Sequence, residues 1–417
     1  MAKSGLEVLK ERGFVQQCTD MDALEKLMDS ERVTFYVGVD PTGASLHIGH
    51  MVPFFAMHHL QKAGHRPIAV VGGGTSMIGD PSGKSDMRKM LTIEQINENA
   101  SSIKDQLGKI IDFGEDQAIM VNNYDWLGGL NYLSFLRDIG IHFSVNRMLS
   151  FEAYKQRLEK GLNFIEFNYQ LLQSYDFLKL NQDYGCKLQM GGDDQWGNIV
   201  AGMELIRRVE GPEAEAIGLT FPLVTRADGK KMGKTEKGAV FLDPSMFSPY
   251  EFFQYWRNVA DADVGKFLKF FTFLEIEEIA ELEKLEGSDI NVAKERLAFE
   301  QTRIIHGEEE AAKALEAAKA AFTSGGGEGA MDKDSIPSVD VPSSEIEAGI
   351  GIMDLFARTG LCSSRGEARR LVQQGGARVN EVQISDIDAV VGSDAVVDGE
   401  ILLKAGKKRY FRVVVID

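Results

Sequence analysis

A strand, a helix and a second strand near the start of the chain constrain its fold more than any other feature. Residues 33–39 and 67–72 are apolar runs typical of strands, and the helix-like run 51–63 lies between them. Two buried strands that flank one helix predict a βαβ unit with parallel strands and a right-handed crossover. We therefore expect an α/β fold whose largest domain contains a parallel sheet.

The turn from the first strand into that helix carries His-Ile-Gly-His at positions 47–50. Pro53 fits the first turn of a helix that begins near His50, because N–H groups there have no partner within the helix. Helix N-termini present free N–H donors and a partial positive charge. Two imidazoles and a glycine at this place predict a phosphate-binding turn, and hence a nucleotide site.

Two glycine-rich segments carry basic residues but lack the spacing of a P-loop. That motif needs a glycine five positions before Gly-Lys-Ser/Thr, where this chain has Ile78 in one segment and Asp228 in the other. Lys84 and Arg88 in the first segment are cations that can meet phosphate, or can remain solvated surface charges. The same alternatives hold for the lysine cluster at 230–234.

A polar stripe interrupts the largely apolar helix expected at 163–180. Tyr169, Gln173 and Asp176 recur at spacings of four and three, which places them on one helix face. Such a stripe can be the wet side of the helix or a surface that faces a ligand. Because the helix is apolar enough to be buried, and a buried carboxylate needs a partner, we favour the ligand-facing interpretation.

A second strand-to-helix turn follows the strand expected at 187–190. It holds Gly192, two adjacent aspartates and Gln195 before the helix expected at 199–209. Successive residues point in different directions, so a metal site made of Asp193 and Asp194 is weakly supported. Helix capping and a hydrogen bond to a ligand hydroxyl are the favoured roles, and we predict no protein metal site.

Composition restricts the class and the compartment. The net charge of −17 argues against broad nucleic-acid or membrane binding by the whole surface, although it leaves a local basic face possible. Three cysteines are too few and too scattered for a disulfide scaffold or a zinc site, which suits a reducing cytoplasm. Neither a signal peptide nor an apolar run of membrane-spanning length is expected.

The end of the chain differs in charge from the rest. Residues 351–417 hold ten of the 46 Lys and Arg but only nine of the 63 Asp and Glu. A predicted capping box at 364–367 opens a helix with three arginines along one side, and lysines follow in a later hairpin. This pattern fits contact with an RNA backbone, or an ordinary solvated helix. The basic residues are Arg365, Arg369, Arg370, Lys407 and Lys408.

Composition shifts suggest four parts. We expect a catalytic domain over 1–240, in which 125–165 is an insertion or subunit contact. A helical domain over 241–323 and a Gly/Ser/Pro-rich linker over 324–350 follow. The last part, 351–417, is a small α+β domain.

Taken together, these motifs resemble the class I aminoacyl-tRNA synthetases, and within them the bacterial tyrosyl-tRNA synthetases. Residues 47–50 match the HIGH signature, residues 231–235 match a variant of the KMSKS signature, and residues 351–417 resemble an S4 RNA-binding domain. The resemblance covers nearly the whole chain. It implies a Rossmann-like catalytic domain, a helical domain and an S4-like module in a cytoplasmic homodimer.

The resemblance also implies roles for single residues. Tyr36 and Asp176 bind the phenol oxygen of L-tyrosine, while Asp80, Tyr169 and Gln173 hold its amino group and Gln195 lies near its carboxylate. The implied adenosine site is lined by Gly38, Asp40, Gly49, Gly192 and Asp194. Those implied to stabilise the pyrophosphate are Thr42, His47, His50, Lys84, Arg88, Lys231, Lys234 and Thr235, with Lys234 also counted as ATP-binding.

The implied reaction is the activation of L-tyrosine by ATP, which carries Mg²⁺, followed by transfer of tyrosine to the 3′ end of tRNA(Tyr). Two departures from relatives stand out: Val37 replaces a frequent Cys, and Asp193 a frequent Ser. Two other functions remain as alternatives. One is an RNA-binding regulator with a silent catalytic body, against which His47 and His50 argue. The other is an adenylyl-transferring enzyme for a small molecule, which has no evident use for residues 351–417.

Overall fold

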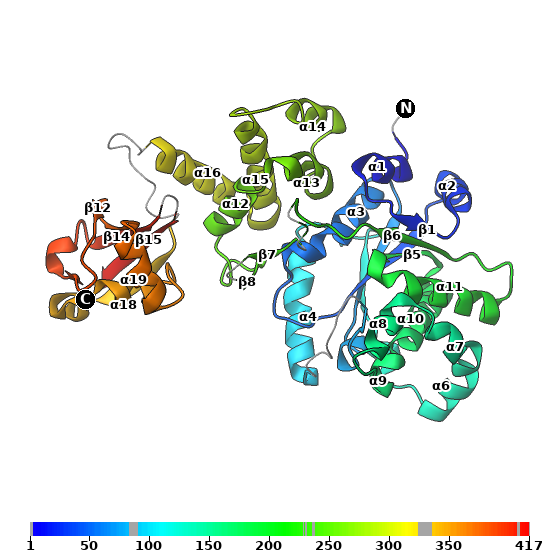
Figure 1. Ribbon diagram of the computed structural model, residues 1–417. Helices are drawn as coiled ribbons and strands as arrows, with labels where there is room; N and C mark the ends of the chain where they lie inside the picture. The colour runs from blue at the N-terminus through cyan, green and yellow to red at the C-terminus, as the bar shows by residue number, and fades with distance from the viewer. Residues whose placement is uncertain are drawn as a thin grey trace. The chain divides into compact units, whose positions relative to one another are not determined.

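The computed structural model describes residues 3–82, 91–227, 229, 232–235, 238–323, 336–406 and 409–416 (Figure 1). It divides into two compact units. Unit 1 comprises Met1–Phe247 and Arg257–Ile305, and unit 2 comprises Ser248–Trp256 and His306–Asp417. Within the described residues, no helix has both the length and the apolar character needed to cross a membrane.

Unit 1 is built on a six-stranded sheet with the order β1-β6-β5-β2-β3-β4. All neighbouring pairs are parallel except β1, which is antiparallel to β6. The predicted parallel sheet and α/β class are therefore confirmed. The strands are β1 (Gln17–Cys18), β2 (Thr34–Val39), β3 (Arg66–Val71), β4 (Ile119–Asn122), β5 (Cys186–Gly192) and β6 (Ile217–Phe221).

The strand order explains where a ligand can bind. From β2 the chain adds β3 and β4 on one side, and later β5 and β6 on the other. This is the doubly wound order, in which a crevice opens at the carboxyl ends of the two strands where the direction reverses. Those strands are β2 and β5, so the segments after Val39 and Gly192 face the crevice.

Helices flank this sheet, and most lie where the apolar spacing predicts them. Two short N-terminal helices flank the two-residue strand β1, which was not predicted because so short a run has no periodicity. The bounds are α1 (Gly5–Arg12), α2 (Met21–Ser30), α3 (Met51–Lys62), α4 (Ile93–Leu107), α10 (Tyr169–Tyr184) and α11 (Trp196–Glu210).

The single helix predicted over 163–180 is interrupted, which corrects that prediction. It consists of α9 (Phe164–Phe167) and α10, with Asn168 between them. The Asn168 side chain donates to the Phe164 carbonyl at 2.6 Å. An asparagine that bonds to its own backbone competes with the helical ladder, which explains the break at this residue. Tyr169, Gln173 and Asp176 all remain on α10.

The segment 125–165, predicted as an insertion or subunit contact, is largely helical. It is closed by an ion pair between Arg157 and Glu166, 2.9 Å apart, whose side chains are each less than 5% exposed. The helices in this segment are α5 (Tyr124–Leu127), α6 (Tyr132–Asp138), α7 (Val145–Met148) and α8 (Glu152–Leu158).

The predicted separate helical domain over 241–323 does not form a body of its own. Residues 257–305 belong to unit 1, with α13 (Val264–Phe271), α14 (Ile276–Leu282) and α15 (Ile290–His306). The physical reason is an apolar face on α13, whose Phe270 ring lies 5.0 Å from that of Phe14. Helical periodicity alone does not reveal which body such a face packs against.

A buried arginine attaches the N-terminal helix to this segment. Arg12 is 5% exposed, and its guanidinium donates to the carbonyls of Lys269 and Thr272 at 3.1 and 3.0 Å and also to that of Leu274. Burial lowers the pKa of Arg12 from its ordinary value. The guanidinium thus satisfies carbonyls at the end of α13, which have no partner within that helix.

Unit 2 contains α12 (Pro249–Arg257), α16 (Glu308–Thr323) and a C-terminal module, residues 336–416. The module has a five-stranded sheet in the order β12-β11-β14-β15-β9. Its elements are β9 (Ser338–Pro342), α17 (Ser343–Ala348), β10 (Ile350–Gly351), α18 (Ile352–Arg358), α19 (Arg365–Gln373), β11 (Ala377–Val379), β12 (Val382–Gln383), β13 (Val390–Val391), β14 (Glu400–Ala405) and β15 (Arg409–Ile416).

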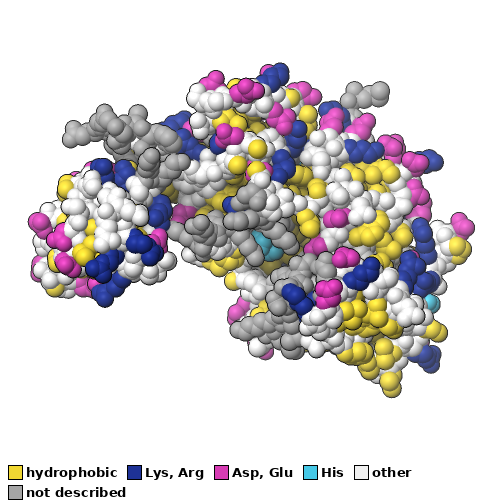
Figure 2. All heavy atoms as spheres, in the orientation of Figure 1, with side chains coloured by type: hydrophobic (Ala, Val, Ile, Leu, Met, Phe, Trp, Pro, Cys, Tyr) yellow, Lys and Arg dark blue, Asp and Glu magenta, His cyan; other side chains and the backbone are white. Residues whose placement is uncertain are grey.

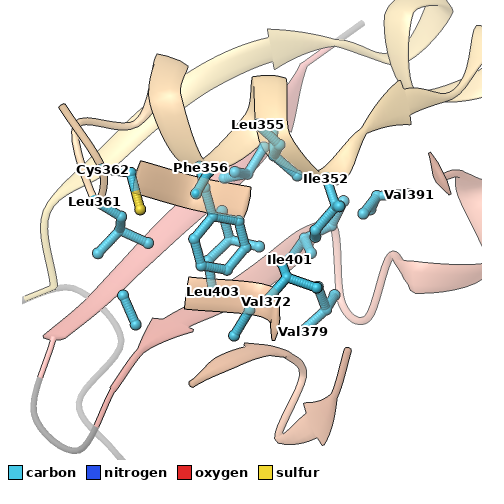
Figure 3. Close-up of a cluster of buried hydrophobic side chains, with 14 of the residues drawn as sticks. Ile352, Leu355, Phe356, Leu361, Cys362, Val372, Val379, Val391, Ile401 and Leu403 are labelled. Carbon is cyan, nitrogen blue, oxygen red and sulfur yellow. The ribbon is translucent and has the colours of Figure 1, made fainter. Parts of the chain in front are cut away.

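The linker predicted over 324–350 is too long, because the module begins before residue 351. Strand β9 pairs in parallel with β15, and Val341 and Ile346 are buried in the module's core. That core gathers Ile352, Phe356 and Leu403 from helices and sheet (Figure 3). A serine- and proline-rich composition concealed this strand, since an edge strand is specified by its partner as much as by its own sequence.

Candidate active site

Asp176 is the buried carboxylate of the crevice. Its side chain comes from α10, is 3% exposed and accepts hydrogen bonds from Asn123 Nδ2 at 2.9 Å and Trp126 Nε1 at 2.7 Å. Burial raises the pKa of the Asp176 carboxyl to about 7, although both donors favour the charged form. The carboxylate is thus held in one orientation by neighbours from the end of β4.

Tyr36 lies beside Asp176 with its hydroxyl unsatisfied. The residue is 2% exposed, and among the described residues its Oη is buried without a hydrogen-bond partner. Burial, and then the negative charge of Asp176, raise the pKa of Tyr36 well above its ordinary value, so the phenol stays protonated. A buried polar atom without a partner in the protein is a place where a ligand can bind.

Gln189 supplies a second unsatisfied atom on the neighbouring strand. It is in register with Tyr36 across the β2–β5 pair, and it is 2% exposed. Its Oε1 is also buried without a hydrogen-bond partner in the described part of the chain. The two orphaned atoms lie at adjacent positions of the sheet.

A chain of hydrogen bonds leads from Asp176 to Asp40. Asn123 Nδ2 also donates to Thr75 Oγ1 at 3.0 Å, and Thr75 Oγ1 donates to Asp40 Oδ1 at 2.7 Å. The hydroxyl of Tyr169 donates to Asp40 Oδ2 at 3.1 Å. The predicted tyrosine-binding and ATP-binding residues are therefore joined in one polar network.

A second network brings together Asp80, Gln173 and Gln195. Gln195 Nε2 donates to Asp80 Oδ2 at 2.7 Å, and the backbone N–H of Ser82 donates to Asp80 Oδ1 at 2.9 Å. Asn198 Nδ2 lies 3.2 Å from both Gln173 Oε1 and Gln195 Oε1. Side chains from two turns, α10 and α11 thus converge on one place.

The His-Ile-Gly-His turn forms a short 3₁₀ helix over Ile48–His50, directly before α3. The N–H of Gly49 donates to His47 Nδ1 at 3.1 Å, and the N–H of His47 donates to His50 Nδ1 at 3.4 Å. The two rings stack with their centroids 3.7 Å apart. Because both Nδ1 atoms accept, the neutral rings carry their protons on Nε2.

The second signature segment packs directly on this turn. A Cβ atom on Gly49 would lie 3.2 Å from the Met232 carbonyl oxygen, and one on Gly233 would lie 2.9 Å from the Gly49 nitrogen. Gly233 also has φ of +90°, a conformation that favours glycine. Lys234 and Thr235 follow in strand β7 (Lys234–Thr235), which pairs with β8 (Gly238–Ala239).

Several predicted site residues cannot be placed. Lys84, Arg88 and Lys231 lie outside the described residues, as do Lys407 and Lys408. For Lys234 and Thr235 the structure describes the backbone only.

The remaining predicted nucleotide-site residues lie at the strand ends. Thr42 is exposed, and its N–H donates to the Asp40 carbonyl at 2.8 Å. Gly38 lies near the end of β2, and Gly192 ends β5. A Cβ atom on Gly192 would lie 2.7 Å from Asp194 Oδ1, so a side chain there would displace the Asp194 carboxylate.

Asp193, the unusual aspartate of this turn, points to other partners. Its Oδ1 accepts from Gln17 Nε2 at 2.7 Å and from Thr220 Oγ1 at 2.9 Å. Both partners belong to the β1–β6 strand pair. The Asp193 carboxylate, whose purpose the sequence did not reveal, therefore attaches the turn after β5 to the edge of the sheet.

Five polar residues of the site were not predicted. Gln189 offered a signal, because a glutamine between Leu188 and Met190 in a buried strand is unusual. Asn123 offered another, since it follows β4 much as Asp40 follows β2. In the described part of the chain these residues are Thr75, Asn123, Trp126, Gln189 and Asn198. Among the residues described, no group of three or more His, Cys, Asp or Glu side chains is placed to hold a metal ion.

The three arginines predicted to bind tRNA, Arg365, Arg369 and Arg370, are exposed on α19. The predicted capping box is only half formed: Ser364 Oγ accepts from the Glu367 N–H, but the Glu367 carboxylate accepts from Ser363 instead of Ser364. The N–H and the Oγ of Ser363 each donate to that carboxylate at 2.6 Å. Arg365 pairs with Asp354 of α18.

Comparison with known proteins gives a consistent family. The model described as "tRNA synthetases class I (W and Y)" matches residues 28–323, and the model described as "Tyrosine--tRNA ligase SYY-like C-terminal domain" matches residues 334–413. The second match begins within the predicted linker, in agreement with the position of β9.

Curated relatives match along nearly the whole chain. The tyrosine–tRNA ligase of Treponema denticola is 60% identical over 410 residues, with 98% of each chain covered. That of Acetivibrio thermocellus is 55% identical over 413 residues, with 99% of this chain and 100% of the relative covered. A solved structure of a C-terminally truncated mitochondrial tyrosyl-tRNA synthetase from Aspergillus nidulans is 32% identical, with a TM-score of 0.67 over 75% of this chain and 93% of that one.

Proposed function

The chain belongs to the class I tRNA synthetases of the tryptophan and tyrosine type and acts as a tyrosine–tRNA ligase, and from this premise we propose how its residues perform the reaction. The enzyme activates L-tyrosine with ATP, forming tyrosyl-adenylate and pyrophosphate, and then transfers tyrosine to the 3′ end of tRNA(Tyr).

The phenol oxygen of tyrosine binds between Tyr36 and Asp176. The observation that carries this assignment is the buried Tyr36 hydroxyl without a partner among the described residues, next to an oriented carboxylate. The substrate hydroxyl donates to Asp176 and accepts from Tyr36. Phenylalanine would leave the desolvated Tyr36 hydroxyl without a partner and Asp176 without the substrate's donor, which costs free energy and explains selectivity for tyrosine.

The other end of the amino acid binds the second network. Asp80, Tyr169 and Gln173 accept from or lie beside the ammonium group, and Gln195 lies near the carboxylate. The bonds of Gln195 to Asp80 and of Asn198 to Gln173 support this assignment, because they fix the side chains before the substrate arrives. Prior orientation lowers the entropy lost on binding.

The triphosphate binds at the His-Ile-Gly-His turn. Thr42, His47 and His50 stabilise the β- and γ-phosphates, and the Nε2–H tautomers inferred above make both imidazoles donors. The basic residues of the two glycine-rich segments complete this site by sequence resemblance. They are Lys84, Arg88, Lys231 and Lys234, and the hydroxyl residue Thr235 joins them. The adenosine lies along Gly38, Asp40, Gly49, Gly192 and Asp194.

The chemistry needs position and charge rather than a protein nucleophile. The tyrosine carboxylate attacks the α-phosphorus of ATP, the bond to the β-phosphate oxygen breaks, and pyrophosphate leaves. ATP enters as its Mg²⁺ complex, so the metal belongs to the substrate. Donors that meet the charge growing on the leaving group lower the barrier.

An amino-acid-dependent ATP–pyrophosphate exchange assay tests this proposal. Tyrosine should support exchange, whereas phenylalanine and tryptophan should not. Exchange with tryptophan but not tyrosine would contradict the pocket assignment. Charging of total tRNA by the same preparation tests the second half-reaction.

tRNA(Tyr) contacts the exposed face of α19 in the C-terminal module. Arg369 and Arg370 are exposed there, on a module whose basic and acidic residues nearly balance in an otherwise acidic chain. Phosphate contacts of this kind depend on salt. Lys407 and Lys408 extend the proposal by sequence alone.

The enzyme works as a homodimer through the segment around α6 and α7. Leu133, Ile141 and Phe164 are 74%, 76% and 69% exposed, and Tyr132 and Val145 exceed half. Figure 2 shows a hydrophobic area at the lower right of this view, where Figure 1 draws α6 and α7. An apolar patch of this kind suits a symmetric contact between two copies.

Sedimentation at several concentrations tests the dimer. The wild-type chain should have twice the monomer mass, and Leu133→Asp with Ile141→Asp should shift it to the monomer. A wild-type monomer at micromolar concentration would contradict the proposal.

We assign the enzyme to the cytoplasm, which its unbridged Cys18 and Cys186 thiols suit.

A further inference from the structure

A buried glutamine outside the substrate site supports the His-Ile-Gly-His turn from behind. Gln106 lies near the end of α4 and is 6% exposed. Its Oε1 accepts from the N–H of Leu46 at 2.8 Å and lies 3.3 Å from Ser45 Oγ. The bonded N–H belongs to the residue immediately before His47.

The same short stretch is also bonded to the segment that follows the lysine cluster. Ile48 N–H donates to the Val240 carbonyl at 3.0 Å, and Leu242 N–H donates to the Leu46 carbonyl at 2.9 Å. The N–H of Asp243 donates to Ser45 Oγ at 3.2 Å. Residues 45–48 therefore lie between α4 on one side and residues 240–243 on the other.

Helix α4 contacts the other end of this loop as well. Asn99 Nδ2 donates to the Pro41 carbonyl at 3.0 Å, next to Thr42. Gln106 and Asn99 thus bind both ends of the loop 41–46, which leads into His47. Figure 1 draws α4 in cyan, and in the sequence it directly follows the glycine-rich segment that carries Lys84 and Arg88.

We infer that Gln106 is a positioning residue for tyrosyl-adenylate formation. It holds the Leu46 peptide, and through it the His47 imidazole, at a fixed place beside residues 240–243. Without this acceptor the Leu46 N–H is buried and unsatisfied, so the peptide must rotate or admit water. The hydrogen bonds that the described residues make to Gln106 come from Ser45 and Leu46, outside the proposed tyrosine pocket, so tyrosine binding should be spared.

The inference rests on the phosphate-binding role proposed for His47, and Gln106→Leu tests it. The matched control is Gln301→Leu, the same exchange at a fully buried glutamine of α15, whose Nε2 donates to the Phe271 carbonyl. Both variants remove one buried bond to the backbone within unit 1. Single-turnover adenylate formation and equilibrium tyrosine binding are measured for each.

Gln106→Leu should lower the rate constant of adenylate formation about 10- to 100-fold, the range expected for misplaced reacting groups. Its tyrosine dissociation constant should stay within about twofold, and Gln301→Leu should leave both quantities within about twofold. An unchanged rate overturns the inference. So does an equal loss in Gln301→Leu, or a parallel loss of tyrosine affinity.

Ser45→Ala provides a second variant if Gln106→Leu does not fold. It should also slow adenylate formation, by a smaller factor, with tyrosine affinity retained. Gln106 and Ser45 belong to the same hydrogen-bonded cluster. The rate constant of the double variant should therefore fall by less than the product of the two single losses. Fully multiplicative losses overturn the inference. A wild-type enzyme without tyrosine-dependent exchange overturns the proposed function itself, whereas active wild type with unimpaired variants overturns only the role of Gln106.

Discussion

The tyrosine pocket and the α19 surface use polar side chains in opposite ways. Asp176 is buried and bonded to Asn123 and Trp126, whereas Arg369 and Arg370 are exposed on a helix that covers an apolar core. In the pocket the Asp176 carboxylate has fixed partners and is shielded from water, so one side chain controls recognition. On the helix, water and salt compensate for a lost contact, so only the summed charge matters.

Loss of the central carboxylate should produce the largest effect. Asp176→Ala removes the acceptor for the substrate hydroxyl, and it removes the acceptor that Asn123 Nδ2 and Trp126 Nε1 share. We expect kcat/KM for tyrosine to fall roughly 100-fold or more, with KM for ATP changed by less than about threefold. Steady-state exchange kinetics measure both. Equal losses for the two substrates would remove the distinction between pocket and phosphate site.

A neighbour of the carboxylate should matter less. Asn123→Ala removes one donor to Asp176 and the bond to Thr75. We expect tyrosine affinity to fall about tenfold, because the carboxylate keeps the Trp126 bond. The pKa of Asp176 should rise further, since a hydrogen bond to the charged form is lost. Ala at exposed Asn97 of α4 is the control, and should change neither quantity.

The pH dependence sharpens the contrast, because the pocket contains a carboxyl whose pKa is raised close to neutrality. Burial raises the pKa of Asp176 to about 7, so the ionised acceptor is lost as pH falls through 7. Tyrosine affinity should drop about tenfold from pH 8 to pH 6. Equilibrium dialysis measures it, and Asp176→Asn should flatten the profile.

The same shift has a consequence for stability. A folded-state pKa above the unfolded value means that the folded chain binds the proton more tightly. The contribution of Asp176 to the free energy of unfolding is therefore complete below about pH 4, declines as pH rises to about 7, and is constant above. In denaturant titrations, the difference in unfolding free energy between wild type and Asp176→Asn should change with pH in this window and be constant on either side of it.

Charge removal on α19 should have a moderate, salt-dependent effect. Arg369→Gln with Arg370→Gln should weaken tRNA binding about three- to tenfold at low salt and reduce its salt dependence. Tyrosine-dependent exchange should not change. Filter binding at several salt concentrations tests this. A loss of exchange, or an unchanged tRNA affinity, would contradict the division between the two regions.

Arg365 should give the smallest effect of the set. Its guanidinium pairs with Asp354, and this bond raises the pKa of Arg365 and lowers that of Asp354. Arg365→Gln should therefore weaken tRNA binding less than about twofold, and Asp354→Asn should strengthen it slightly. An effect of Arg365→Gln as large as that of the other arginines would show that it contacts RNA directly.

Local spacing predicted some of the site and missed the rest for a physical reason. The stripe of Tyr169, Gln173 and Asp176 is visible because one helix supplies all three residues. Asn123 and Trp126 reach Asp176 from about fifty positions earlier, and no periodicity reports such a contact. The spacing of residues in the sequence reveals which side chains share a helix face. Which side chains from other elements they contact depends on the order of strands in the sheet.

The same limit explains the domain boundaries. Strand β9 was taken as linker because its partner, β15, lies some seventy residues later. Helix α13 was assigned to a separate domain because its apolar face does not name its partner. The sheet class and the signature turn were predictable, since each depends on a short stretch with its own periodicity or capping.

The buried guanidinium of Arg12 has a consequence for synthesis on the ribosome. Its acceptors lie 257 to 262 residues later in the chain, at Lys269, Thr272 and Leu274. Strand β1 likewise pairs with β6, which is synthesised about 200 residues later. The first segment made is therefore among the last to dock, and until then the nascent chain exposes an incomplete core to chaperones and proteases.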